Sequence, residues 1–383
     1  TSISASATNI DTFTTATFDS AFYLAVTKDE INDEVSTAQI SLVHDNSSAM
    51  VSAGGGVQSG DNAQLTYTAD INSGTVRLRG TGTAAVNSIK FYKIGLGDNT
   101  SASSAGNVAT IINTDVDSAV ENLDTWAHAS YRGAKYYISM NNSTNGEVGN
   151  IECLVTHNGS DAFITNYNDV FTGSNSLVNS LTADISGDNV RLRASCSPNT
   201  AVKMYRVLLS DAESDASSTN TKTVGQTTTS SGASSMDSFV TDSANGAHYI
   251  VVGNSSSEGA SSISEVFVTT DGTDAYISTG PSVSTKGSDQ LTFTAALSGT
   301  TVTVSSASTS GASTTVNAYR VNLLRASAGA ATSEQVLVST TQTITGAKTL
   351  SNAVVKMTNL PTSDPSVAGQ LWNSSGTLKI SAG

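Results

Sequence analysis

A pattern that returns at a constant spacing restricts the fold of this chain more than any other feature of its sequence. The stretch "IDTF" from Ile10 returns as "LDTW" from Leu123 and as "MDSF" from Met236, at spacings of 123 − 10 = 113 and 236 − 123 = 113 residues. Corresponding later stretches, "TVRLRG", "NVRLRA" and "TVTVSS", begin at Thr75, Asn189 and Thr301. A register kept over this length predicts a tandem array of one structural unit.

Within each unit the sequence has the alternation of β-strands. In "AQLTYTADI" the apolar residues Leu65, Tyr67, Ala69 and Ile71 alternate with polar ones, as expected for a strand with one buried face. The pairs Asn158-Gly159 and Asp271-Gly272 are typical of hairpin turns, since both positions tolerate positive φ. We therefore predict an all-β protein of three tandem antiparallel β-sandwich repeats, jelly-roll or Ig-like, of about 113 residues each, with a small β-rich C-terminal oligomerisation tail.

Segments rich in Ser, Thr, Asn and Gly predict the boundaries between the repeats. In chain order we predict an N-terminal joint (1–9), the first repeat (10–98), a linker (99–119), the second repeat (120–211), a second linker (212–235), the third repeat (236–326) and the C-terminal tail (327–383).

The composition disfavours several classes of function. Apolar residues make up 38% of the chain and charged residues 13%, with a formal net charge of −14. Such an acidic surface repels phosphate backbones, so we expect no nucleic-acid partner. No long apolar run predicts membrane insertion, and the first residues lack the basic and apolar regions of a signal peptide.

Few residue types suited to catalysis or metal binding are present. The chain has four histidines and two cysteines, and no nucleophile, phosphate-loop or metal-spacing motif accompanies them. His44 and His157 share a repeat position with Thr270, which favours a role at the edge of a turn. Acidic residues in segments 113–118 and 271–274 could suit calcium, but turn chemistry explains the latter equally well. We predict no catalytic, cofactor or metal site, and expect Cys153 and Cys196 to be free and buried.

Two further groups of residues have both a structural and a functional interpretation. The repeated Asp11, Asp124 and Asp237 suggest polar turns before the first strand of each repeat, with the following aromatic residue closing the sandwich. The second repeat is richest in aromatic residues. Its candidates for contact with a surface or glycan are Trp126, Tyr131 and Tyr167, with burial in the core as the alternative.

The tail differs from the repeats. Gln370–Trp372 and Thr377–Ile380 predict a small hairpin, which would be marginally stable alone. Its apolar residues must pack on the third repeat or on other copies of the chain, and we favour an oligomer. The candidate oligomerisation residues are Leu360, Leu371, Trp372, Leu378 and Ile380.

The tail also carries a resemblance. "TQTITGAKTLSNAVV" is similar to a segment of bacteriophage tail-fibre proteins, and "NLPTSDPSVAGQLWNSSGTLKISAG" resembles the C-terminal ending of virion structural proteins of marine, cyanophage-like bacteriophages. The match spans residues 341–383. It implies a non-enzymatic fibre or spike on the virion surface, often a homotrimer. Other virion proteins and a host glycan or receptor would be its partners.

Two alternatives remain open at this point. A capsid decoration protein would use the same repeats to cover a shell without binding a receptor. A cellular surface adhesin would use them too, but should carry a secretion signal. No N-terminal attachment domain is recognisable, so the position on a particle is left open.

Overall fold

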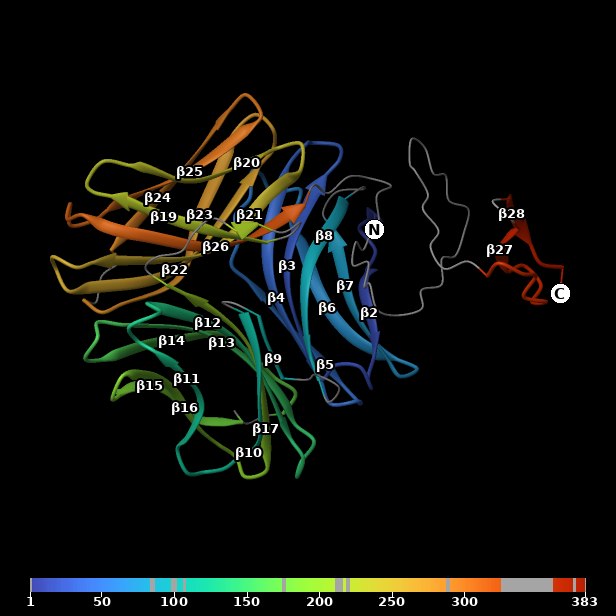
Figure 1. The fold of residues 1–383 in the computed structure, drawn as a ribbon, viewed down its shortest axis with the longest axis horizontal. Helices are drawn as coiled ribbons and strands as arrows, with labels where there is room; N and C mark the ends of the chain where they lie inside the picture. The colour runs from blue at the N-terminus through green and yellow to red at the C-terminus, as the bar shows by residue number, and fades with distance from the viewer. Residues whose placement is uncertain are drawn as a thin grey trace. The chain divides into compact units, whose positions relative to one another are not determined.

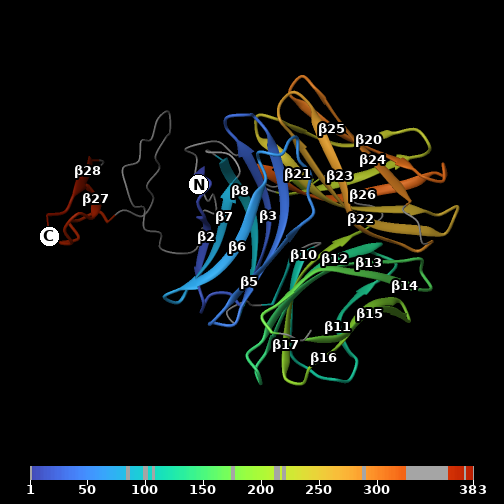
Figure 2. The ribbon, with the colours of Figure 1, turned by 180° about the vertical axis from the view of Figure 1, so that it is seen from behind.

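The structure is a computed structural model, which describes residues 2–82, 87–97, 102–105, 108–173, 177–210, 216–217, 221–286, 290–324, 361–374 and 377–382. The chain divides into two units, Thr1–Thr332 and Ser333–Gly383, which we describe separately. Figures 1 and 2 show the strands of the first unit gathered into paired sheets. Among the described residues, no helix is long and apolar enough to cross a membrane.

The first sandwich pairs a five-stranded sheet, in the order β1-β8-β3-β4-β5, with a three-stranded sheet, β2-β7-β6. Its strands are β1 (Ser2–Ile3), β2 (Thr8–Thr14), β3 (Ser20–Asp29), β4 (Val35–His44), β5 (Ala49–Gly54), β6 (Leu65–Asn72), β7 (Thr75–Gly82) and β8 (Asn87–Leu96).

The second sandwich pairs the six-stranded sheet β14-β13-β12-β17-β10-β9 with the three-stranded sheet β11-β16-β15. Its strands are β9 (Ser103–Ala105), β10 (Val108–Val116), β11 (Glu121–Ala127), β12 (Gly133–Asn142), β13 (Val148–His157), β14 (Ala162–Phe171), β15 (Val178–Ser186), β16 (Asn189–Cys196) and β17 (Thr200–Leu209).

The third sandwich repeats this layout, with sheets β18-β19-β26-β21-β22-β23 and β20-β25-β24. Its strands are β18 (Ala216–Ser217), β19 (Thr221–Thr229), β20 (Ser234–Val240), β21 (Ala244–Ser255), β22 (Ala260–Thr270), β23 (Ala275–Ser284), β24 (Leu291–Ser298), β25 (Thr301–Ser308) and β26 (Thr314–Leu324).

The alternation in the sequence accounts for these strands. In β7 the side chains alternate along the whole strand between half-buried and buried, because successive residues of a strand face opposite sides of the sheet. The buried side chains of the two sheets form one apolar core per sandwich, around Tyr23, Tyr136 and Tyr249 respectively. All the strand pairs among the described residues are antiparallel. The predicted all-β antiparallel fold is confirmed.

The turn pairs lie in hairpins as predicted, between β13 and β14 and between β22 and β23, but the glycine alone of each pair takes a positive φ. Gly159 and Gly272 take φ values of 95° and 92°, and the preceding Asn158 and Asp271 accept backbone N–H bonds from residues two and three positions later. In the first sandwich Asn46 takes the positive φ of 69°. An Asn tolerates this region better than most residues.

The predicted linkers contain strands as well as connecting chain. β10 lies in segment 99–119 and pairs with β17, and β19 lies in segment 212–235 and pairs with β26. Both strands are rich in Thr or in β-branched apolar residues, which favour strands, and each lies one place in from the edge of its sheet, next to β9 or β18. Composition did not predict these strands, because the Ser, Thr and Asn content of the two segments resembles that of flexible linkers.

The large sheets are buried on both faces. Almost every residue of β3, β12 and β21 is buried, because one face covers the core of its own sandwich and the other contacts a neighbouring sandwich. Three further apolar clusters form these contacts. One cluster contains Leu24 and Phe267, a second contains Leu154 and Ile263, and the third contains Phe22 and Tyr137. The sandwiches therefore pack on one another.

In the second unit, β27 (Leu371–Ser374) and β28 (Thr377–Ile380) form an antiparallel hairpin in which Leu371 pairs with Ile380. The Asn373 N–H donates to the carbonyl oxygen of Pro361 at 2.8 Å, and Ser381 Oγ lies 2.5 Å from Asp364 Oδ1. The hairpin is thus held by the proline-containing segment before it. This hairpin agrees with the sequence pattern.

Candidate functional site

Three tyrosines at one repeat position mark the place where the sandwiches meet. Tyr92, Tyr205 and Tyr319 lie on β8, β17 and β26, and each contacts two of the three clusters between sandwiches. Burial, followed by the neighbouring hydroxyl groups of Tyr92 and Tyr319, raises the pKa of Tyr205 well above its ordinary value. All three tyrosines are half-buried, so the junction is aromatic and partly shielded from solvent.

A cluster of ionisable side chains, here called the central cluster, lies at the same junction. Lys135 Nζ is 2.5 Å from Glu152 Oε2 and 2.5 Å from Glu265 Oε1. Lys135, Glu152, Glu265 and His248 are all fully buried. His248 Nε2 lies 3.6 Å from Glu265 Oε2. The residues come from the second and third sandwiches, so the charges join two repeats.

Neutral polar groups complete the central cluster. Tyr167 OH donates to Glu265 Oε1 at 2.6 Å, and Asn168 Nδ2 donates to Glu152 Oε1 at 2.6 Å. Gln39 Nε2, from the first sandwich, also donates to Glu152. Buried charges are tolerated when opposite charges and hydrogen bonds compensate them, and all three sandwiches contribute to that compensation.

The two glutamates differ in their electrostatics. Burial, together with the charge of Glu265, raises the pKa of Glu152 to about 7 despite the nearby ammonium group. Burial would also raise the pKa of Glu265, but Lys135 and His248 outweigh it and lower that pKa to about 2. Burial would lower the pKa of Lys135, yet the two carboxylates raise it. Glu265 and Lys135 are therefore the ionised pair, and Glu152 titrates near neutral pH.

The central cluster breaks the symmetry of the repeats. Gln39, Glu152 and Glu265 share one repeat position, since 39 + 113 = 152 and 152 + 113 = 265. Lys135 and His248 share another with Phe22, since 22 + 113 = 135 and 135 + 113 = 248. The first position thus carries one amide and two carboxylates, and the second carries one benzyl group, one ammonium and one imidazole. The three sandwiches are therefore not interchangeable at their junction.

Sequence reasoning missed this cluster, although a local signal existed. Glu152 and Glu265 lie in fully buried strands that carry no other acidic residue and no Lys or Arg, "VGNIECLVTH" and "ASSISEVFVTT". A charged residue in the middle of a fully buried strand requires a partner. The partner could not be read from the sequence, because Lys135 and Tyr167 lie on other strands.

The repeated aspartates hold the two sheets of each sandwich together. Each lies at an irregularity of strand register rather than in a turn before the strand, so the predicted turn is wrong. Each accepts hydrogen bonds from a buried tyrosine and a basic residue of the large sheet. The three sets are Asp11, Tyr23 and Lys93; Asp124, Tyr136 and Arg206; and Asp237, Tyr249 and Arg320.

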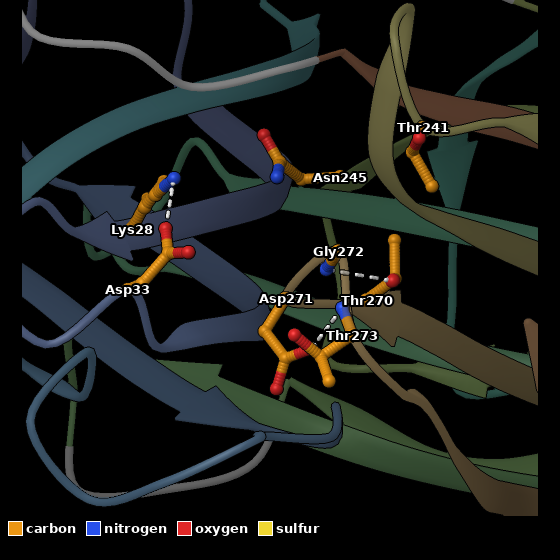
Figure 3. Close-up of a pocket in the computed structure, with 8 residues that line it drawn as sticks. All are labelled: Lys28, Asp33, Thr241, Asn245, Thr270, Asp271, Gly272 and Thr273. Atoms are coloured by element: carbon orange, nitrogen blue, oxygen red, sulfur yellow. Dashed lines mark hydrogen bonds and ion pairs between the residues drawn. The ribbon is translucent and has the colours of Figure 1, made fainter. Parts of the chain in front are cut away.

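A polar pocket lies between the first and third sandwiches (Figure 3). Its volume is about 230 Å³. The end of β3 and the turn after it form one wall, where Lys28 pairs with Asp33. The turns of the third sandwich form the other. The lining residues are Lys28, Asp33, Thr241, Asn245, Thr270, Asp271, Gly272 and Thr273.

The carboxylate of Asp271 is fixed within this pocket. Its Oδ1 accepts the N–H groups of Thr273 and Asp274 at 2.8 and 2.9 Å, and its Oδ2 accepts the hydroxyl of Tyr276 at 2.9 Å. Burial alone would raise the pKa of Asp271, but the effect of these hydrogen bonds is larger, and the pKa lies below its ordinary value. Among the described residues, no group of three or more metal-ligating side chains comes together.

The candidate aromatic residues have different environments. Trp126 is 4% exposed and its Nε1 donates to Tyr136 OH at 2.9 Å, so it offers no exposed ring in this structure. Tyr131 packs half-buried against the second core, and Tyr167 belongs to the central cluster. The structure does not bring the three together. Contact with a glycan stays a prediction for Tyr131 and Tyr167.

Four of the five candidate oligomerisation residues lie in the hairpin. Leu371 and Trp372 are half-buried, whereas Leu378 and Ile380 are 52% and 69% exposed. Leu360 lies outside the described residues. Cys153 and Cys196 are free and buried, as expected. His44 and His157 each bond a backbone carbonyl oxygen of the chain just before β3 or β12, that of Phe18 or Tyr131, and each also accepts the N–H of the turn residue two positions later, in keeping with a role at a turn edge.

Comparisons with known proteins give no assignment: no protein-family model matches the chain, and no curated protein matches it.

Proposed function

We propose that this chain is a non-enzymatic structural protein of a bacteriophage particle. It forms a fibre or spike-like appendage on the virion surface that contributes to host-surface contact. Its partners are other copies of itself, in a homotrimer, and neighbouring virion proteins. Several weak contacts made side by side would gain avidity without any single strong site.

One observation carries this proposal. The C-terminal hairpin exposes Leu378 and Ile380 at 52% and 69%, within the segment whose sequence resembles phage fibre endings. Neighbouring exposed apolar side chains on so small an element favour a binding partner. An assembly element that follows a large packed β-unit suits an appendage made of several chains.

The same packing of sandwiches would also suit a capsid decoration protein, and a cellular surface adhesin remains the further alternative. Gold-labelled antibodies against the chain, viewed on intact particles by electron microscopy, separate the three. Labels on tail appendages support the proposal, and labels spread over the head support decoration. Labels on uninfected cells and none on particles would overturn it.

A further inference from the structure

One residue that lines the pocket between the first and third sandwiches is a threonine where the other two sandwiches carry a histidine. Thr270 of the pocket shares its repeat position with His44 and His157, since 44 + 113 = 157 and 157 + 113 = 270. At this position of the pocket the third sandwich thus has a hydroxyl group where the other two have an imidazole.

The backbone around this position is the same in all three sandwiches. His44 Nδ1 accepts the N–H of Asn46 at 3.2 Å, and His157 Nδ1 accepts the N–H of Gly159 at 3.1 Å. In the third sandwich Thr270 Oγ1 accepts the N–H of Gly272 at 3.1 Å. The short side chain keeps the bond that fixes the turn.

The third sandwich lacks the contacts that the Nε2 side of the imidazole makes in the other two sandwiches. His44 Nε2 lies 2.5 Å from the carbonyl oxygen of Phe18, and its ring lies 6.0 Å from that of Phe13. His157 Nε2 lies 2.8 Å from the carbonyl oxygen of Tyr131, and its ring lies 5.5 Å from that of Trp126. Thr270 cannot reach so far, and Thr241 and Asn245 line the opened space instead.

The opposite wall is equally well defined. Asp29 is fully buried and its carboxylate accepts the N–H of Ile31 at 2.8 Å and the side-chain amide of Asn32 at 2.5 Å. These bonds set the turn that places Lys28 and Asp33 at the pocket (Figure 3). Both walls are therefore built by hydrogen bonds before any ligand arrives.

The lining selects a class of ligand. One ammonium and two carboxylates sum to +1 − 2 = −1, which disfavours an anion. Hydroxyl, amide and charged groups disfavour an apolar molecule, because they would lose their hydration without compensation. A neutral molecule with many hydroxyl groups can donate to Asp33 and Asp271 and accept from Lys28. The volume of about 230 Å³ lies below that of drug-sized pockets and suits a single ring.

We infer that this pocket binds one sugar unit of a surface glycan. The inference deepens the proposed contact with a host surface and rests on that function for its biological meaning. It involves none of the aromatic residues named from the sequence.

Saturation-transfer difference NMR of the full chain, with the methyl glycosides of glucose, galactose, mannose and N-acetylglucosamine as probes, tests this inference. We expect a signal from at least one probe. Thr270→His, the residue that both siblings carry, should abolish it, because the imidazole refills the space and the backbone already accommodates it. Thr292→His, on the exposed side of β24, is the matched control and should leave the signal unchanged.

A second variant acts from the other wall. Lys28→Met should weaken or abolish the same signal while the circular-dichroism melting curve stays that of the native chain. No signal from any of the probes, or a signal that persists in Thr270→His, would overturn the sugar site and leave the role on the particle standing. Absence of the chain from particles would overturn that role and leave a confirmed sugar site standing.

Discussion

At the scale of single residues, the central cluster determines how stability depends on pH. Glu152 and Glu265 occupy the same repeat position and contact the same Lys135, yet their pKa values move in opposite directions, to about 7 and about 2. A raised carboxyl pKa disfavours the folded state when the group ionises, whereas a lowered one favours it. The two glutamates therefore provide a matched pair.

Glu152→Gln should make the folded chain more stable above neutral pH. With a folded pKa of about 7 against an ordinary 4.5, the folded state holds more protons between these values. Its stability falls by up to about 3 kcal/mol as pH rises through this window. The amide of the variant cannot ionise, so this loss does not occur. The first repeat already carries an amide, Gln39, at the same repeat position. Urea denaturation at about pH 8 measures the gain; a less stable variant would contradict the assignment.

Glu265→Gln should have the opposite effect. Its folded pKa of about 2 lies below the ordinary 4.5, so its ionised form contributes up to about 3 kcal/mol above that ordinary value. This contribution is lost as pH falls from 4.5 towards 2. The variant should be markedly less stable than the native chain at neutral pH, and the difference should shrink in acid. A constant difference across the urea titrations would rule out this origin.

At the scale of elements, the sequence predicted the strands well because their signal is local. The alternation in "TVRLRG" and the turn at Asn158-Gly159 are complete within a few residues. The partners of Asp124 were beyond such reasoning, since Arg206 lies 82 residues away. β10 and β19 were missed because they lie within segments whose Ser, Thr and Asn content is that of a flexible linker.

Tyr136→Phe should destabilise the second sandwich by about 2 kcal/mol, because a buried acceptor and a buried donor lose their partner. Its hydroxyl donates to Asp124 Oδ2 at 2.9 Å and accepts from Trp126 Nε1 at 2.9 Å. Tyr276→Phe removes one hydroxyl–carboxylate bond nearer the surface and should change stability by less than about 0.5 kcal/mol. Equal effects of the two variants in thermal denaturation would contradict this account.

The hairpin of β27 and β28 is the element that we expect to assemble chains. Leu378→Ser combined with Ile380→Ser removes its exposed apolar side chains, and should lower the mass of the oligomer while the first unit stays folded. Multi-angle light scattering gives the mass, and circular dichroism gives the fold. A native chain that is already a monomer, or a variant with unchanged mass, would refute the proposed role of the tail.

At the scale of the whole molecule, the contacts among sandwiches matter more than the repeat itself. The repeat spacing and the all-β class were evident from the sequence. The sequence did not indicate that Gln39, Lys135 and Glu265 come together in one cluster, because a tandem repeat does not reveal whether its units contact one another. The central cluster and the pocket are both formed by residues of more than one sandwich. Their existence therefore depends on the packing of the three sandwiches within one chain.

Differential scanning calorimetry of the full chain tests this packing most directly. If the sandwiches unfold together, the van't Hoff enthalpy of the main transition should equal the calorimetric enthalpy, a ratio of about one. Glu265→Gln should then shift that whole transition. Three sandwiches that unfold independently would give a ratio of about one third. That ratio, with only part of the transition shifted by Glu265→Gln, would contradict a single packed unit.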